Sequence, residues 1–237
     1  MFETDQTGGT HREGAPSSTP VDREEEVRIA LGPVTLAGTL GPVGAARGIV
    51  VFAHGSGSSR HSPRNRRVAR GLRAAGLATL LFDLLTAEEE EAERYTRHLR
   101  FDIPLLAGRL VGVTDWLARG EATRGLRVGY FGASTGAAAA LAAAAERPGA
   151  AGAVVSRGGR PDLAGDALGR VRAPTLLIVG GADPEVLELN RAALARLTGE
   201  KDLVVVPGAT HLFEEPGTLD AVERHAAAWF ARHLADE

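Results

Sequence analysis

The stretch from residue 126 to 147 most constrains what this chain can fold into. It opens with the apolar and aromatic run LRVGYF, which is typical of a short buried strand. The motif GASTG follows at 132–136, and the alanine-rich run after it is a strong helix former. A strand and a helix joined by Gly-x-Ser-x-Gly is the pattern of a nucleophile elbow, a tight turn that presents a serine hydroxyl above the sheet. The pattern therefore predicts that Ser134 is a nucleophile.

A serine at this position also has a common structural use, as the N-cap of the helix that follows. The nucleophile interpretation adds a chemical advantage, because the helix would aim its free amides and its positive end at the place where an oxyanion forms. The two interpretations are separated by whether the rest of the chain supplies a general base and an acid in suitable loops.

Strand and helix patterns alternate over the rest of the chain. Two segments of alternating apolar and polar residues, 26–31 and 34–40, predict an antiparallel hairpin at one edge of a sheet. The later patterns predict strands at 48–53, 77–82, 126–131, 152–155, 173–180 and 202–206, and helices at 64–75, 103–117, 137–145, 185–197 and 219–234. This order predicts an α/β fold with a mostly parallel eight-stranded sheet and helices on both faces.

The N-terminal segment differs from the rest. Residues 1–22 are polar and rich in Gly, Ser, Thr and Pro, which predicts a disordered tail. The length of 237 residues and the hydrophobic content of 44% suit one large core, so residues 23–237 are expected to form a single domain. An acidic run at 88–93 is expected to be a solvated face rather than a metal site.

Charge and composition limit the classes of molecule that this chain is expected to bind. The net charge of −3 and the pI of about 6.2 predict no binding to nucleic acid or to a membrane surface. There are no cysteines, which excludes disulfides, thiolate metal sites and a cysteine nucleophile. No apolar stretch has the length of a membrane span, and the N-terminus lacks a signal core. We expect a cytoplasmic protein, a monomer or homodimer, with a small-molecule substrate.

Two later loops offer the base and the acid that a serine nucleophile needs. Asp183 lies in GGAD after the strand at 173–180, and His211 lies in GATHLF after the strand at 202–206. Both loops fall at the carboxyl edge of the predicted sheet, in the chain order Ser, Asp, His. Each residue has a structural alternative, since Asp183 before Pro184 is a good helix N-cap and His211 could be an ordinary loop histidine. The three residues in three suitable loops predict a catalytic triad.

Two further segments reach the same edge. In HGSGSS at 54–59, His54 is expected to support the loop by hydrogen bonds, and the spacing fits neither a dinucleotide-binding loop nor a P-loop. Arg157 and Arg160 follow the strand at 152–155, where they could bind a substrate carboxylate or phosphate, or pair with surface acids. The sequence leaves these two roles open.

The chain resembles the α/β-hydrolase superfamily, nearest to the dienelactone hydrolase-like group, over about residues 24–235. The matching text is HGSGSS, GASTG, GGAD and GATHLF. The resemblance implies the α/β-hydrolase fold, with the backbone amides of Thr135 and Ser56 as the oxyanion donors. Dienelactone hydrolases have a cysteine where this chain has Ser134, which favours ordinary ester chemistry over dienelactones.

Together these features predict a serine hydrolase that cleaves small carboxylic esters through an acyl-enzyme, without a cofactor or metal. A thioesterase, acyltransferase or peptidase would use the same triad, and a hydrolase-fold binding protein is the alternative outside enzymes. The segments that could form a cap, 84–100 and 156–172, are short and polar. They predict a minimal cap or none, and an open site suited to short acyl chains.

Overall fold

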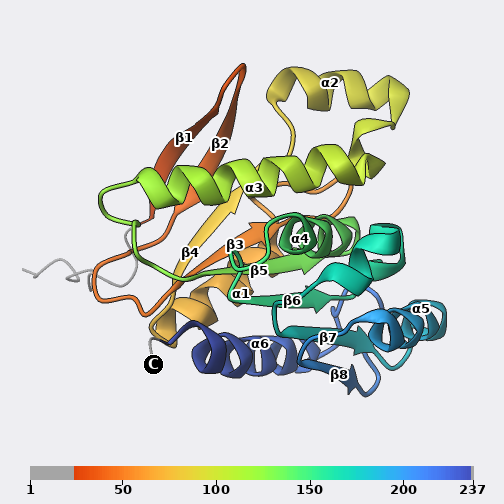
Figure 1. The fold of residues 1–237 in the computed structure, drawn as a ribbon. Coiled ribbons are helices and arrows are strands. Elements are labelled where there is room, and N and C mark those ends of the chain that lie inside the picture. Colours follow the sequence, from red (N-terminus) through yellow and green to blue (C-terminus); the bar gives the residue numbers. More distant parts are fainter. Residues whose placement is uncertain (1–23, 236–237) are drawn as a thin grey trace, which may run out of the picture.

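An eight-stranded sheet runs through the computed structural model, which describes residues 24–235 (Figure 1). The strands are β1 Glu25–Leu31, β2 Val34–Leu40, β3 Ile49–Ala53, β4 Ala78–Phe82, β5 Val128–Ala133, β6 Ala153–Arg157, β7 Thr175–Gly180 and β8 Lys201–Val206. Their order across the sheet is β1-β2-β4-β3-β5-β6-β7-β8. The β1–β2 and β2–β4 pairs are antiparallel and all the others are parallel, which confirms the predicted edge hairpin and parallel sheet. The predicted tail, residues 1–22, lies outside the described residues.

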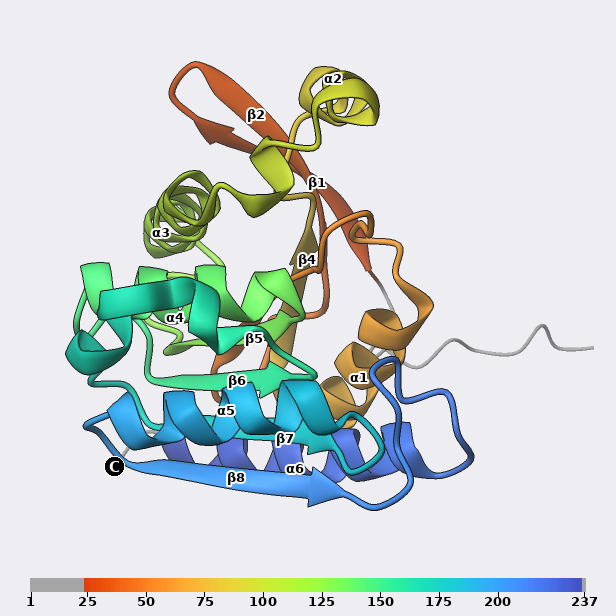
Figure 2. The same cartoon turned by 90° about the vertical axis from the view of Figure 1, so that its right-hand side faces the viewer.

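Helices cover both faces of the sheet (Figures 1 and 2). They are α1 Pro63–Ala74, α2 Ala87–Thr96, α3 Ile103–Arg119, α4 Thr135–Glu146, α5 Pro184–Arg196 and α6 Thr218–Leu234, with short 3₁₀ helices η2 Leu99–Phe101 and η3 Pro161–Arg170. The buried side chains of α3, α4 and α5 join one apolar cluster, and those of α1 and α6 join another on the opposite face. Among the described helices, none has both the length and the apolar character needed to cross a membrane.

Strand β3 shows why the sequences of the central strands are continuous apolar runs. All five of its residues are buried. Ile49 and Val51 belong to the cluster under α3 and α4, whereas Val50 and Phe52 belong to the cluster under α1 and α6. Because successive side chains of a strand point to opposite faces, a strand covered on both sides must be apolar at every position.

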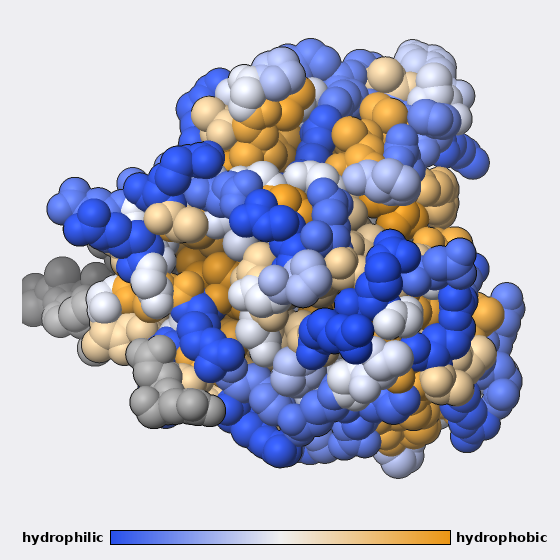
Figure 3. Space-filling view, viewed as in Figure 1, coloured by the Kyte–Doolittle hydropathy of each residue, from blue (hydrophilic) through white to orange (hydrophobic). Residues whose placement is uncertain are grey.

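The β1–β2 hairpin and α2 extend to one end of the molecule (Figure 1). A groove of about 530 Å³ separates the hairpin turn from α3, and residues such as Leu31, Val34 and Leu105 line it. Figure 3 shows hydrophobic surface beside this hairpin, and further hydrophobic areas elsewhere on the same face.

The acidic run at 88–93 is the predicted solvated face except at its last residue, because Glu88 and Glu91 are exposed and Glu93 is not. It forms most of α2, and Glu93 is fully buried. The Glu93 carboxylate accepts hydrogen bonds from the Thr96 hydroxyl and from the backbone N–H groups of His98, Leu99 and Arg100. Burial raises the pKa of Glu93, but these hydrogen bonds outweigh burial and lower the pKa to about 2. The charge therefore organises the chain between α2 and η2.

Candidate active site

Ser134 occupies a sharp turn between the end of β5 and the start of α4. Its backbone has φ 52° and ψ −122°, a conformation that residues other than glycine rarely adopt. The flanking glycines make the turn possible because other backbone atoms approach both positions too closely to leave room for a side chain. A side chain at Gly132 would overlap the Ala137 backbone, and one at Gly136 would overlap the backbone of Ala53 at the end of β3. This geometry is that of a nucleophile elbow.

The Ser134 side chain is not used to cap α4. Ser134 occupies the N-cap position, but its hydroxyl accepts no capping hydrogen bond. The structural alternative for this serine is therefore not realised, and the hydroxyl is available to a pocket that Ser134 lines.

Asp183 and His211 contact each other directly. Asp183 occupies the N-cap position of α5 without a capping hydrogen bond from its side chain. Instead, its Oδ2 accepts a hydrogen bond from Nδ1 of His211 at 2.9 Å. Since Nδ1 carries the proton in this contact, Nε2 of the neutral ring is left as an acceptor. The two loops are joined by a backbone hydrogen bond of 2.9 Å from Ala182 to Ala209.

A tight turn holds His211 in place. The Phe213 N–H donates to the carbonyl oxygen of Thr210, and Phe213 has a positive φ of 56° while its ring is buried. Glu215 accepts hydrogen bonds from both the hydroxyl and the backbone N–H of Thr210. These Thr210 contacts lower the pKa of Glu215, so its charged form anchors the turn.

Ser134 and His211 line one pocket of about 270 Å³. The other lining residues come from the loop after β3, the first turn of α1, the ends of β5 and β6 and the loop after β8: Gly55, Ser56, Ser58, Ser62, Arg64, Asn65, Ala133, Arg157, Gly158 and Leu212. No hydrogen bond joins Ser134 to His211 within the described structure. Such contacts commonly tighten only when a substrate binds.

The two predicted oxyanion donors lie side by side. The Thr135 N–H is at the first position of α4, where no intrahelical partner exists, and it donates to no other described group. The Ser56 N–H donates to the side-chain Oγ1 of Thr135 at 2.9 Å. The Thr135 amide is therefore free, whereas the Ser56 amide already has a partner from its neighbour.

His54 supports the loop that carries Ser56, as the sequence predicted. Its Nε2 accepts a hydrogen bond from the Leu84 N–H at 3.0 Å, so Nδ1 carries the proton and donates to the carbonyl oxygen of Gly55 at 2.9 Å. Burial lowers the pKa of His54, which keeps the ring neutral in this role.

The two predicted substrate arginines have different surroundings. Arg160 forms a two-point ion pair with Asp162, at 2.9 and 2.7 Å, and is not among the residues that line the Ser134 pocket. Arg157 does line that pocket and is only 6% exposed. Burial, together with the charge of Arg64, lowers the pKa of Arg157 to about 10.

Sequence reasoning missed Arg64 and Asn65 as pocket residues. Both lie in the first turn of α1. The available signal was position, because this helix begins directly after the HGSGSS loop at the carboxyl edge of β3. No group of three or more histidine or acidic side chains within residues 24–235 is arranged to hold a metal ion.

Residues 36–234 match the model of the dienelactone hydrolase family. The solved structure of dienelactone hydrolase from Anabaena variabilis is 62% identical in sequence, with a TM-score of 0.88 over 90% of this chain and 98% of that one. Est1E from Butyrivibrio proteoclasticus is 16% identical with a TM-score of 0.73, over 89% and 99% of the two chains. The Pyrococcus furiosus esterase Pf2001 is 18% identical with a TM-score of 0.70, over 94% and 99%. The last two share the α/β-hydrolase fold.

Two curated proteins from strains of Mycobacterium tuberculosis are 62% identical to this chain over 218 residues. Both are named, provisionally, as phosphoribosyl transferases. The match covers 92% of this chain but 48% of each relative, so the chain spans about half the length of these curated relatives.

Proposed function

The chain belongs to the dienelactone hydrolase family, and on that premise we propose that it is a serine hydrolase that cleaves small carboxylic esters. Family membership supports a hydrolase activity, whereas the ester substrate and the residue roles are our proposal. One observation carries it: Asp183 and His211 are hydrogen-bonded at 2.9 Å, and His211 shares a pocket with Ser134 on its elbow.

In the proposed mechanism, Ser134 Oγ attacks the ester carbonyl while Nε2 of His211 takes its proton. Asp183 holds the ring in the required tautomer and stabilises the imidazolium that forms. The tetrahedral intermediate then breaks its bond to the leaving oxygen, which receives the proton from His211. A water molecule deprotonated by His211 hydrolyses the acyl-enzyme, releases the acid and restores the Ser134 hydroxyl.

The oxyanion of each tetrahedral intermediate would be held by the amides of Thr135 and Ser56. The Thr135 amide already lacks a partner, which suits the role. The Ser56 amide would have to transfer its hydrogen bond from Thr135 Oγ1 to the oxyanion. Loss of one such donor typically lowers turnover by about 100-fold or more.

Covalent labelling tests the nucleophile. The wild-type protein should react with a fluorophosphonate probe and hydrolyse nitrophenyl acetate, and Ser134→Ala should do neither. The hydroxyl makes no capping hydrogen bond, so we expect Ser134→Ala to keep the cooperative thermal unfolding of the wild type. An alanine variant that turns over at the wild-type rate would refute the assignment. Assays with alcohol and amine acceptors separate hydrolysis from acyl transfer.

The name of the curated relatives suggests a second activity, phosphoribosyl transfer. We infer that phosphoribosyl transfer, if those relatives perform it, resides in the part that this chain does not cover, because this chain matches the hydrolase family over 36–234. This chain should therefore release no pyrophosphate from phosphoribosyl pyrophosphate in the presence of purine or pyrimidine bases. Release at a rate that Ser134→Ala leaves unchanged would contradict this inference.

A further inference from the structure

Arg157 is a buried cation without an acidic partner in the described structure. Its guanidinium donates one hydrogen bond, from Nη2 to Oδ1 of the buried Asn65 at 3.2 Å, and it lies 5.8 Å from the centre of the Phe213 ring. Its Nε has no hydrogen-bond partner among the described residues. Buried charges are normally paired, because an isolated charge loses its hydration without compensation. Because Arg157 lines the Ser134 pocket, the position suggests that an anionic ligand balances the charge of its guanidinium.

Other positive groups face the same pocket. Arg64 lies close enough to lower the pKa of Arg157, and its own Nε is also buried with no hydrogen-bond partner in the part of the chain that the structure describes. Glu214 balances Arg64 from one side, because its Oε1 accepts a hydrogen bond of 2.8 Å from Nη1 of Arg64. The 12-residue helix α1 begins at Pro63, after the N-cap Ser62, so its positive end is directed here.

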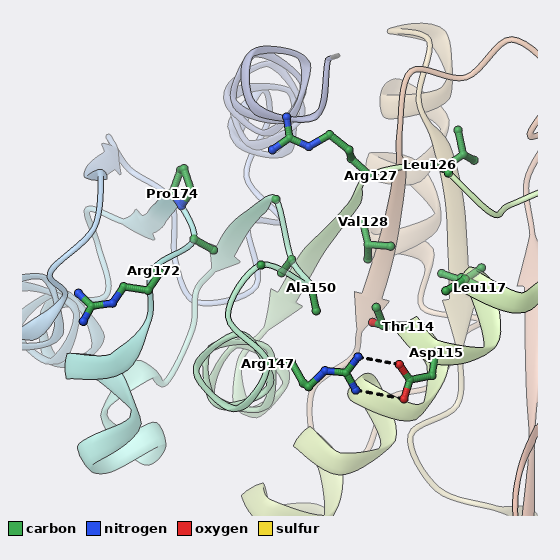
Figure 4. Close-up of a pocket in the computed structure, with 16 residues that line it drawn as sticks. Thr114, Asp115, Leu117, Leu126, Arg127, Val128, Arg147, Ala150, Arg172 and Pro174 are labelled. Carbon is green, nitrogen blue, oxygen red and sulfur yellow. Dashed lines mark hydrogen bonds and ion pairs between the residues drawn. The ribbon is translucent and has the colours of Figure 1, made fainter. Parts of the chain in front are cut away.

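A second arginine-rich pocket, at the amino edge of the sheet, provides a contrast (Figure 4). There Arg147 forms a two-point ion pair with Asp115, at 3.2 and 3.0 Å. Arg127 and Arg172 point away from that pair, and each donates to a nearby protein oxygen. These arginines do not converge on a common point. Arg157 and Arg64 differ because they line a smaller pocket beside a proposed nucleophile, and because no described acid pairs with Arg157.

We propose that the Ser134 pocket recognises a phosphate group on the ester substrate, with Arg157 as its principal ligand and Arg64 as the second. The proposal rests on the proposed function, which places the substrate at Ser134, and it adds a substrate class: esters that carry a phosphate. Arg157 is then a specificity-determining residue, whereas Arg160 has no part in this recognition.

The number and the charge of the donors favour phosphate over carboxylate. A phosphate monoester carries a charge of about −1.5 to −2 at neutral pH and three acceptor oxygens. The pocket offers two guanidiniums, the hydroxyls of Ser58 and Ser62 and the start of α1, and no acidic side chain is among its described lining residues. The nearby acids are Glu214, which pairs with Arg64, and Asp183, which pairs with His211. A carboxylate, with one charge and two oxygens, would leave part of this set unsatisfied.

Inorganic phosphate is the probe that tests the site. We expect phosphate to inhibit nitrophenyl acetate hydrolysis competitively and to raise the Tm, and propionate to do both more weakly. Arg157→Met removes the charge at similar length and should weaken phosphate inhibition by about 10-fold to 100-fold, as expected for charge-assisted hydrogen bonds. Arg157→Lys should restore part of the inhibition. Arg160→Met is the matched comparison and should keep the wild-type inhibition constant.

The Tm measurement needs no catalysis, so it separates this proposal from the proposed function. A Tm rise with phosphate that Arg157→Met abolishes supports the site even if Ser134 proves inactive towards esters. Phosphate that neither inhibits nor stabilises the wild type, or that does so equally in Arg157→Met, overturns the proposal. Tighter inhibition by propionate than by phosphate overturns the assignment of phosphate.

Discussion

Two aspartates follow strands at the carboxyl edge of the sheet, and their partners differ. Asp183 accepts a hydrogen bond from His211, whereas Asp83 accepts hydrogen bonds from the backbone N–H and the guanidinium of Arg60, at 2.8 and 2.5 Å. The Asp83 contact ties the loop after β3 to the end of β4. Each carboxylate therefore has a distinct task, one beside the proposed base and one in the support of a loop.

Exchange of each aspartate for asparagine separates these tasks. Asp183→Asn should lower kcat for nitrophenyl acetate by about 10²-fold to 10⁴-fold, because the amide no longer fixes the tautomer of His211. Asp83→Asn should lower the Tm while most of the turnover remains, since Asp83 does not contact His211 in the structure. Steady-state kinetics and thermal unfolding of both variants provide the check. The reverse pattern would move the proposed acid to Asp83.

At the scale of elements, the junction between α2 and η2 depends on one buried charge. The Glu93 carboxylate accepts hydrogen bonds from three backbone N–H groups at this junction, which would otherwise be unpaired. Its folded-state pKa of about 2 is below its ordinary value of 4.5, so the unfolded chain binds a proton more readily. The stability that Glu93 contributes is therefore complete above pH 4.5 and is lost as the pH falls towards 2.

We expect the difference in unfolding free energy between wild type and Glu93→Gln to be largest above pH 4.5 and to shrink at lower pH. Denaturant unfolding across this pH range measures it. Glu91→Gln is the control, because Glu91 lies on the same helix but its side chain is 60% exposed and, among the described residues, pairs only with Arg94. Identical pH profiles for the two variants would contradict the role given to Glu93.

The elements around the site also bear on substrate size. Helix η3 packs against α4 and α5, and the α2–η2 segment is held by ion pairs such as Glu89 with Arg109. The Ser134 pocket is about 270 Å³ and is lined mostly by small and polar residues. These features leave little apolar surface on which a long acyl chain could be buried.

Short acyl chains should therefore be preferred. Each methylene contributes about 0.8 kcal/mol only when it is buried, so lengthening the chain should bring no steady gain in kcat/KM. We expect acetyl and butyryl nitrophenyl esters to be hydrolysed well and decanoyl esters poorly. Specificity constants across the series measure this, and a steady rise towards long chains would refute the prediction.

At the scale of the whole molecule, the sequence predicted the parts of the fold that depend on local pattern. Every strand and helix named from periodicity is present, because apolar runs and glycine stops reflect burial and chain reversal directly. Helix α2 and the burial of Glu93 escaped prediction. A buried acid looks like an exposed one in sequence, since its partners are backbone amides that the fold brings to it.

The positions of the candidate site's loops could be predicted from the sequence, as the strands and helices could. The loops that carry Ser134, Asp183 and His211 were located from the strands before them, and their roles stay predictions. Sequence could not separate Arg157 from Arg160, which share one short segment. The difference comes from where β6 ends: Arg157 is its last residue and is buried, whereas Arg160 lies in the following loop beside Asp162.

The order of the strands along the chain also determines at which stage of synthesis this protein could become active. The proposed nucleophile follows a central strand, β5, but the proposed acid and base follow β7 and β8, which leave the ribosome after β5. At roughly 5–20 residues per second, several seconds separate the emergence of Ser134 from that of His211. An unfinished chain thus holds a serine without its base. If the triad is as proposed, the nascent protein does not hydrolyse esters until β7 and β8 have joined the sheet.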